Sequence, residues 1–256
     1  MRKKKIVVYS DEGVGPIGLR HLMHSLKNEP RLENFEIKRS KKDLFNTDSW
    51  IDDTALLIFP GGRDVFYQKA LKGLANQRIY DYVSAGGKYL GICAGGYYGA
   101  NSITFEKGYP LEVVDTRELR FFPGEARGSV YGGGLFRYGS ESGSRAANLK
   151  WVHRDEDKGS EFTVYFNGGC AFVDAGKYTN VQTLAKYEDI AERPAAIVKC
   201  SVGNGTAILC GVHPEYSPKF LDHNDPYLHI VHKKLDQGDV KRQHLFGKLL
   251  FYLLEN

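Results

Sequence analysis

Gly91-Ile92-Cys93-Ala94-Gly95 follows the apolar run Lys88-Tyr89-Leu90 without a break. The run reads as a strand, and glycines stand two positions before and two positions after the cysteine. This spacing is typical of a nucleophile elbow, a sharp strand-to-helix turn that leaves no room for a side chain at the glycine positions. A helix starting after Cys93 would point free N–H groups at the sulfur and favour its thiolate. The sequence therefore predicts that Cys93 is a nucleophile.

The segments around the elbow alternate between strand-like and helix-like patterns. The expected strands cover residues 5–9, 35–39, 55–59 and 88–92, and the expected helices cover 16–27 and 65–84. This alternation predicts an α/β fold, a doubly wound, mostly parallel sheet with flanking helices of the flavodoxin-like kind. In such folds functional groups collect at the carboxyl ends of the strands. Cys93 and Pro60-Gly61-Gly62 both stand at such ends.

The second half of the chain combines a long irregular segment with a hairpin and a closing helix. Residues 195–202 and 206–212 flank Gly203-Asn204-Gly205 and predict the hairpin, and an apolar face from Leu245 to Leu253 predicts the helix. Residues 121–145 are rich in Gly, Ser, Arg and Tyr and show no period, so we expect a loop or insertion there within a single domain, 1–256. Its aromatic side chains either close over Cys93 as a lid or belong to a side subdomain.

A thiolate nucleophile needs a base that is itself oriented by a third group. His213-Pro214-Glu215 follows the strand ending at Val212. Proline keeps His213 extended, and residues two apart in an extended segment face the same way, so Glu215 is placed to hold the imidazole. Acyl chemistry also needs oxyanion donors, and the backbone N–H groups of Ala94 and Gly62 are the candidates.

These motifs resemble those of class I glutamine amidotransferases. The carriers of the resemblance are Gly91-Ile92-Cys93-Ala94-Gly95-Gly96, Phe59-Pro60-Gly61-Gly62 and His213-Pro214-Glu215. The resemblance implies the class I amidotransferase-like fold and a Cys93, His213 and Glu215 triad acting on an amide or acyl bond of a small molecule or peptide.

A narrower resemblance is to the amino-terminal domain of eukaryotic biotin-protein ligases. It rests on Gly95-Gly96-Tyr97-Tyr98, Phe121-Phe122-Pro123-Gly124 and Tyr165-Phe166-Asn167-Gly168-Gly169-Cys170, and so spans most of the chain. It implies that a biotin-protein ligase, or the substrate of one, is a possible partner. No Gly-Arg-Gly-Arg biotin-binding motif is present, so we do not expect the chain to biotinylate anything by itself.

Four residues are candidate substrate contacts. Amidotransferases usually carry Gln four residues after the nucleophile, where this chain has Tyr97, which predicts that glutamine is a poor substrate. In the irregular segment, Arg127 or Arg137 could meet a carboxylate or phosphate of the ligand. Tyr131 is an aromatic candidate from the same segment.

Charge and composition narrow the choice of partner. The formal net charge is +4, part of which comes from Arg2-Lys3-Lys4-Lys5, expected to be a solvated end. Basic and acidic residues are interspersed elsewhere, so no nucleic-acid partner is expected. No stretch is long enough for a membrane span, and the four cysteines, 42% hydrophobic content and 256 residues fit a cytoplasmic protein without disulfides.

Other functions compete with the thiol enzyme. Gly13-Val14-Gly15-Pro16-Ile17-Gly18 matches the dinucleotide-binding pattern, although Asp11 and Glu12 would repel a pyrophosphate and the glycines could instead shape a loop over the site. His229 and His232 have helical spacing but no further ligands, so neither a metal nor a cofactor is expected. A non-catalytic binding or regulatory module linked to biotin-protein ligase remains the main alternative to an enzyme.

Overall fold

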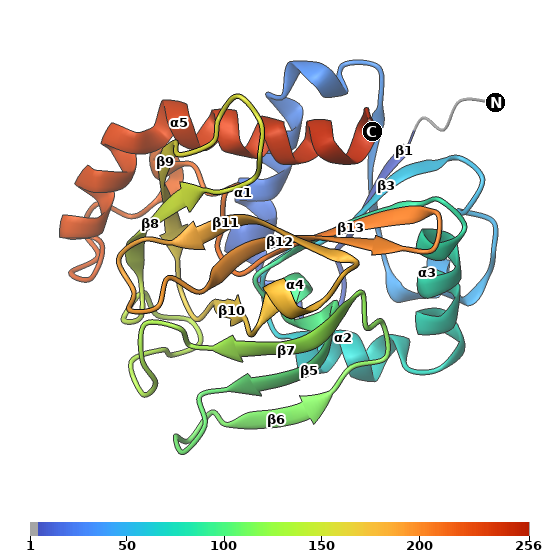
Figure 1. Cartoon of the computed structure of the whole chain (residues 1–256), viewed down its shortest axis with the longest axis horizontal. Helices are drawn as coiled ribbons and strands as arrows, with labels where there is room; N and C mark the ends of the chain where they lie inside the picture. The colour runs from blue at the N-terminus through green and yellow to red at the C-terminus, as the bar shows by residue number, and fades with distance from the viewer. Residues whose placement is uncertain (1–4, 256) are drawn as a thin grey trace.

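The structure is a computed structural model that describes residues 5–255, so most of the basic run at Arg2–Lys5 lies outside the described residues. Five parallel strands form its centre in the order β2-β1-β3-β4-β13 (Figure 1). They are β1 (Lys5–Tyr9), β2 (Glu36–Ser40), β3 (Thr54–Phe59), β4 (Lys88–Ile92) and β13 (Gly205–Cys210). The expected doubly wound α/β fold is confirmed.

Helices cover both faces of this parallel region. Along β1, Val7 and Tyr9 pack on one side with α2 (Asp64–Leu71) and α3 (Leu74–Ser84). Ile6 and Val8 pack on the other side with α1 (Pro16–Lys27) and α5 (His229–Leu254). The alternation follows from the two-residue period of a strand, and two-sided burial explains the continuous apolar runs. Instead of one helix over 65–84, the chain breaks at Gly73, whose φ of 82° favours glycine.

Antiparallel strands extend the sheet beyond β13. The predicted hairpin is present, because β12 (Ala195–Val202) pairs with β13. Beyond β12 the order continues through β10 (Cys170–Phe172), β7 (Phe122–Gly128), β5 (Ala100–Phe105) and β6 (Val113–Thr116). A branch from β12 runs through β11 (Val181–Tyr187), β8 (Arg145–Trp151) and β9 (Glu161–Phe166). Short helices α4 (Ala94–Tyr98), η1 (Pro30–Leu32), η2 (Lys42–Asn46), η3 (Ala175–Lys177) and η4 (Pro218–Phe220) complete the fold.

The irregular segment is shorter than expected. The prediction of a loop over 121–145 was wrong for its first part, because residues 122–128 form β7, and Phe121 and Phe122 are buried in the core. Glycine, proline and two charged residues hid the strand, whose buried positions nevertheless alternate along the chain. The irregular part is residues 129–144, hereafter the 129–144 loop.

No helix between residues 5 and 255 is both long enough and apolar enough to cross a bilayer. Across the same span, no three His, Cys, Asp or Glu side chains gather as a metal site would require.

Candidate functional site

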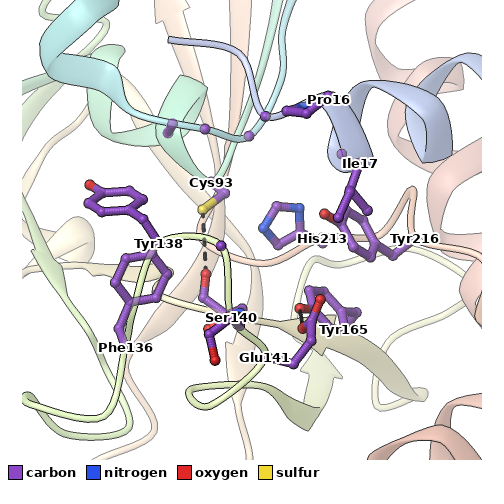
Figure 2. Close-up of a pocket in the computed structure, with 18 of the residues that line it drawn as sticks. Pro16, Ile17, Cys93, Phe136, Tyr138, Ser140, Glu141, Tyr165, His213 and Tyr216 are labelled. Carbon is purple, nitrogen blue, oxygen red and sulfur yellow. Dashed lines mark hydrogen bonds between the residues drawn. The ribbon is translucent and has the colours of Figure 1, made fainter. Parts of the chain in front are cut away.

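Cys93 occupies the turn between β4 and α4 with a φ of 50°, which is unusual for a residue other than glycine. The flanking glycines are required by contact. A Cβ at Gly91 would stand 2.3 Å from the carbonyl oxygen of Gly95, and a Cβ at Gly95 would stand 2.0 Å from that of Phe59. The turn thus has the geometry of the expected elbow and places the Cys93 side chain at the base of a cavity (Figure 2).

His213 and Glu215 meet in the predicted way. Nδ1 of His213 and Oε1 of Glu215 are 2.9 Å apart, and both side chains are buried. The backbone N–H of His213 donates to the carbonyl of Tyr165 at 2.9 Å, which fixes the extended segment against β9. Figure 2 shows the imidazole beside the Cys93 sulfur.

The protonation of His213 depends on both neighbours. Burial lowers the pKa of His213, but the charge of Glu215 and the charge and hydrogen bond of Cys93 outweigh burial and raise this pKa from 6.5 to about 10. The imidazole is therefore protonated at neutral pH. A cation held beside the sulfur stabilises negative charge on it, which is the state a nucleophile needs.

Two helices distant in sequence support the His213–Glu215 segment. The Ser25 hydroxyl on α1 donates to the carbonyl of Glu215 at 2.7 Å. Arg242 on α5 donates to the carbonyl of Pro214 at 2.7 Å and is itself buried. The base and its carboxylate are therefore held through their backbone as well as through each other.

The proposed oxyanion donors Ala94 and Gly62 both line the cavity. Ala94 is the first residue of α4, where a backbone N–H has no partner within its helix. Gly62 lies opposite Val14 in an isolated bridge whose hydrogen bonds are made by neighbouring residues, Gly15 to Gly61 and Arg63 to Gly13. That arrangement leaves the N–H of Gly62 pointing away from the bridge.

The same bridge explains the glycine pattern near residue 13. A Cβ at Gly62 would stand 2.0 Å from the carbonyl oxygen of Gly13, so the two loops approach closely. Gly15, Pro16 and Ile17 line the cavity. These glycines thus shape a loop beside Cys93, which was the alternative to dinucleotide binding.

The cavity has a volume of about 500 Å³ and is walled in part by the 129–144 loop. Phe136, Tyr138 and Glu141 line it from this loop, and Figure 2 shows Phe136 and Tyr138 on the side of Cys93 away from His213. The guanidinium of Arg63 lies 4.0 Å from the ring centre of Tyr138, a cation–π contact that joins the loop to the oxyanion segment.

The structure brings only two of the four candidate substrate contacts to the cavity. Tyr97 and Arg137 line it, and the Tyr97 hydroxyl donates to the carbonyl of Gly168 at 3.1 Å. Arg127 does not line it, because it points off the exposed face of β7 and pairs with Glu125 at 2.6 Å. Tyr131 also lies elsewhere, with its hydroxyl on Asp189 at 2.7 Å.

Several cavity residues were not foreseen. Glu141, Tyr165, Asn167 and Tyr216 all line the cavity, and the Cys93 sulfur lies 3.9 Å from the Asn167 carbonyl oxygen. Tyr165 and Asn167 stand in a segment that carried the resemblance, which was a usable signal. Glu141 had no signal, because its position depends on the path of the loop.

Fold and site together define a glutamine amidotransferase-like protein. A putative GMP synthase protein from Thermoplasma acidophilum has a similar fold, with a TM-score of 0.50, 14% identity and 98% coverage of both chains. A putative ThuA-like protein from Bacteroides uniformis gives 0.53 at 10% identity, with 90% of this chain and 89% of that one covered.

The sequence family is narrower. Residues 4–254 match the family described as biotin-protein ligase, N terminal, and the chain belongs to this family. An uncharacterized protein of Chlamydia muridarum is 39% identical, with 91% of this chain and 88% of that protein covered. The biotin–protein ligase of Schizosaccharomyces pombe is 35% identical over 86% of this chain but only 35% of its own length. The chain thus spans about a third of that ligase.

Proposed function

We propose that the protein is a cysteine-nucleophile enzyme that cleaves or transfers an acyl group from an amide or ester of a small molecule or peptide. The observation that supports it most is the buried Nδ1–Oε1 contact of 2.9 Å between His213 and Glu215, with Cys93 beside the imidazole at the base of a cavity. A cysteine kept only for packing would need neither an elbow nor a buried, charged partner.

The proposed reaction has two stages. The Cys93 thiolate attacks the carbonyl carbon, and the oxyanion accepts hydrogen bonds from the N–H groups of Ala94 and Gly62. Protonated His213 gives its proton to the leaving amine or alcohol as the carbon–heteroatom bond breaks, which leaves an acyl–thioester on Cys93. His213 then takes a proton from water or an acceptor amine, which attacks the thioester and releases the thiol. Glu215 orients the imidazole throughout.

Glutamine is not the substrate we propose. Tyr97 fills the position where amidotransferases usually carry Gln, and its ring is buried against the cavity with its hydroxyl on Gly168. The substrate must instead fit between the 129–144 loop and the His213 side of the cavity.

A second candidate is a binding module that regulates biotin-protein ligase. The family match favours it, because in the Schizosaccharomyces pombe protein a region similar to this chain is part of a biotin–protein ligase. The same cavity would then hold a ligand without turnover, with a ligase or its substrate as partner. All four cysteines are free, which suits the cytoplasm for either function.

Reaction of Cys93 with small acyl donors tests the proposal. We expect incubation with a panel of activated esters at pH 7 to give one acyl adduct by intact-mass spectrometry, which decays as hydrolysed product accumulates. Cys93→Ser should abolish the thioester adduct, and His213→Asn should slow its formation at least tenfold.

The remaining cysteines provide an internal control. Cys170, Cys200 and Cys210 are fully buried, and burial raises the pKa of each thiol, so they should stay unmodified. Acylation of these three before Cys93 would contradict the proposal. A stable Cys93 adduct with no turnover for any donor would favour the binding module.

A further inference from the structure

One side of the cavity above Cys93 is acidic. Glu141 from the 129–144 loop, and Asp222 and Asp225 from the segment before α5, line it. Within residues 5–255, none of these three carboxylates forms an ion pair with a basic side chain. The protein's own cations therefore leave this side of the cavity uncompensated.

Glu141 is held in place instead of being free to turn into solvent. The Tyr165 hydroxyl donates to its carboxylate, and the ring of Tyr165, only 2% exposed, stacks on Tyr216 at 4.3 Å. Figure 2 shows Glu141 beside Tyr165, on the His213 and Tyr216 side of Cys93. The carboxylate is thus preorganised within the same cavity as the nucleophile.

The charge of Asp225 acts directly on Glu141. Burial raises the pKa of Glu141, the Tyr165 hydrogen bond opposes that rise, and the negative charge of Asp225 adds to it. Two carboxylates from separate loops therefore crowd each other at the cavity wall. A cation between them would relieve this repulsion.

Two arginines line the cavity but are occupied elsewhere. Arg137 donates to the carbonyls of Gly134 and Phe136 at 2.8 and 2.7 Å within its own loop. Arg20 donates to the carbonyl of Phe220 at 3.1 Å and lies over that ring. His213, the remaining cation of the cavity, is engaged with Glu215 and Cys93.

We propose that the substrate carries a cationic group, an amine or guanidinium on a short apolar arm, which Glu141 and Asp225 bind while its acyl carbon lies at Cys93. Ile17 and Leu228 line the cavity and supply apolar contacts for the arm. This specificity rests on the proposed function, since it assigns the acyl group to Cys93. It excludes substrates whose corresponding group is a carboxylate or phosphate.

Matched electrophiles test the covalent part. N-aminoethyl, N-propyl and N-carboxyethyl chloroacetamide differ in charge but little in length, and each alkylates a thiolate with loss of chloride. We expect the wild-type Cys93 to react about tenfold faster with the cationic probe than with the neutral one, and slowest with the anionic one. The rate ratio of cationic to neutral probe should fall towards one in Glu141→Gln with Asp225→Asn.

The matched control is Asp236→Asn, which removes an exposed carboxylate of α5 that does not line the cavity. It should keep the wild-type rate ratio. A ratio near one in the wild-type protein, or a ratio that the double variant leaves unchanged, overturns the cationic specificity while leaving Cys93 as a nucleophile.

A non-covalent measurement separates this inference from the proposed function. In Cys93→Ala protein, benzylamine should raise the unfolding temperature more than the neutral benzyl alcohol does, and Glu141→Gln with Asp225→Asn should remove the difference. If Cys93 reacts with no probe but benzylamine still stabilises, the enzyme proposal fails and the cation site stands. Equal effects of the two compounds overturn the cation site.

Discussion

At the scale of single residues, Gly61 shows how tightly the imidazole is confined. A Cβ at Gly61 would stand 2.6 Å from Cε1 of His213, closer than real Cβ atoms approach a neighbour. Because the His213 ring is buried and tied to Glu215, it can make room only by leaving its partners. The glycine is therefore required by the position of the base.

This contact predicts the effect of Gly61→Ala. The methyl group should displace His213 from Cys93, and the rate of Cys93 alkylation by iodoacetamide at pH 7 should fall by about tenfold or more. The control is Gly176→Ala, where an added Cβ meets nothing within 4 Å. Unchanged labelling of folded Gly61→Ala protein would show that His213 does not activate the thiol.

Local patterns made some residues of the site predictable and left others hidden. The spacing of glycines around Cys93 and the two-residue offset of His213 and Glu215 depend only on neighbouring positions. Arg127 was misplaced because β7 was not foreseen, and a strand sends alternate side chains to opposite faces. Glu141 reaches the cavity through contacts with Tyr165, which lies 24 positions away.

At the scale of elements, the 129–144 loop connects β7 to β8 and forms one wall of the cavity. Its chain doubles back, since a Cβ at Gly143 would lie 3.1 Å from Cα of Phe136. Asn167 donates from its side-chain amide to the carbonyl of Ser140 at 3.2 Å, which joins the loop to the segment after β9. The returning part of the loop can therefore be shortened without moving its ends.

We expect that replacing residues 136–142 by two glycines opens the cavity. Phe136 and Tyr138 would no longer shield Cys93, so labelling by a bulky maleimide should rise several-fold relative to labelling by iodoacetamide. The ratio of the two rates is the measurement, with circular dichroism to verify the fold. If the folded variant keeps the wild-type ratio, the loop is not a wall of the site in solution.

At the scale of the whole molecule, the parallel half of the fold was predictable and the antiparallel half largely was not. Buried parallel strands such as β3 are continuous apolar runs, so their sequence alone marks them. The strands β7 to β11 pair across long sequence separations and expose one face or an edge, and their composition is correspondingly mixed. The hairpin of β12 and β13 was an exception because its turn is local.

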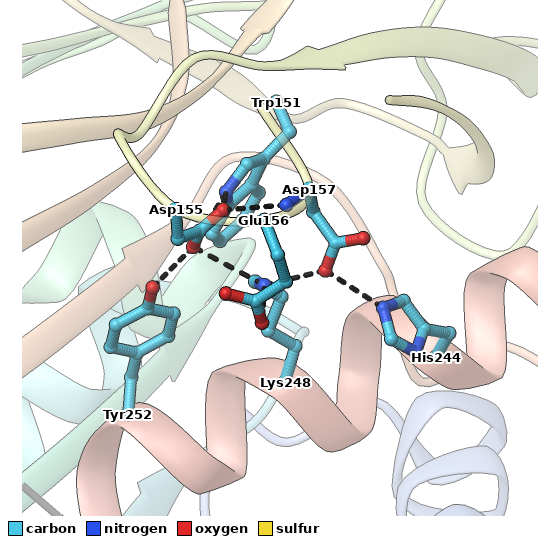
Figure 3. Close-up of polar contacts among 7 residues, drawn as sticks. All are labelled: Trp151, Asp155, Glu156, Asp157, His244, Lys248 and Tyr252. Carbon is cyan, nitrogen blue, oxygen red and sulfur yellow. Dashed lines mark hydrogen bonds and ion pairs between the residues drawn. The ribbon is translucent and has the colours of Figure 1, made fainter. Parts of the chain in front are cut away.

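The last helix ties the antiparallel half to the parallel half through a buried lysine. Lys248 on α5, whose side chain is 6% exposed, contacts Asp155, Glu156 and Asp157 in the connection between β8 and β9 (Figure 3). Tyr252 donates to Asp155, and His244 lies 2.9 Å from Asp157. Desolvation lowers the pKa of Lys248, but its three acidic partners outweigh that and raise this pKa, so the lysine stays charged.

Lys248→Met should therefore destabilise the whole fold. The substitution keeps the apolar stem but leaves Asp155 and Asp157 facing each other without a cation, and removing one partner of a largely buried ion pair costs about 2 kcal/mol or more. For a chain of this size we expect the unfolding temperature to drop by about 4 to 8 °C in calorimetry. Lys234→Met, on an exposed position of the same helix, should change it by less than about 1 °C. Equal unfolding temperatures for the two variants would mean that the acidic connection does not anchor α5.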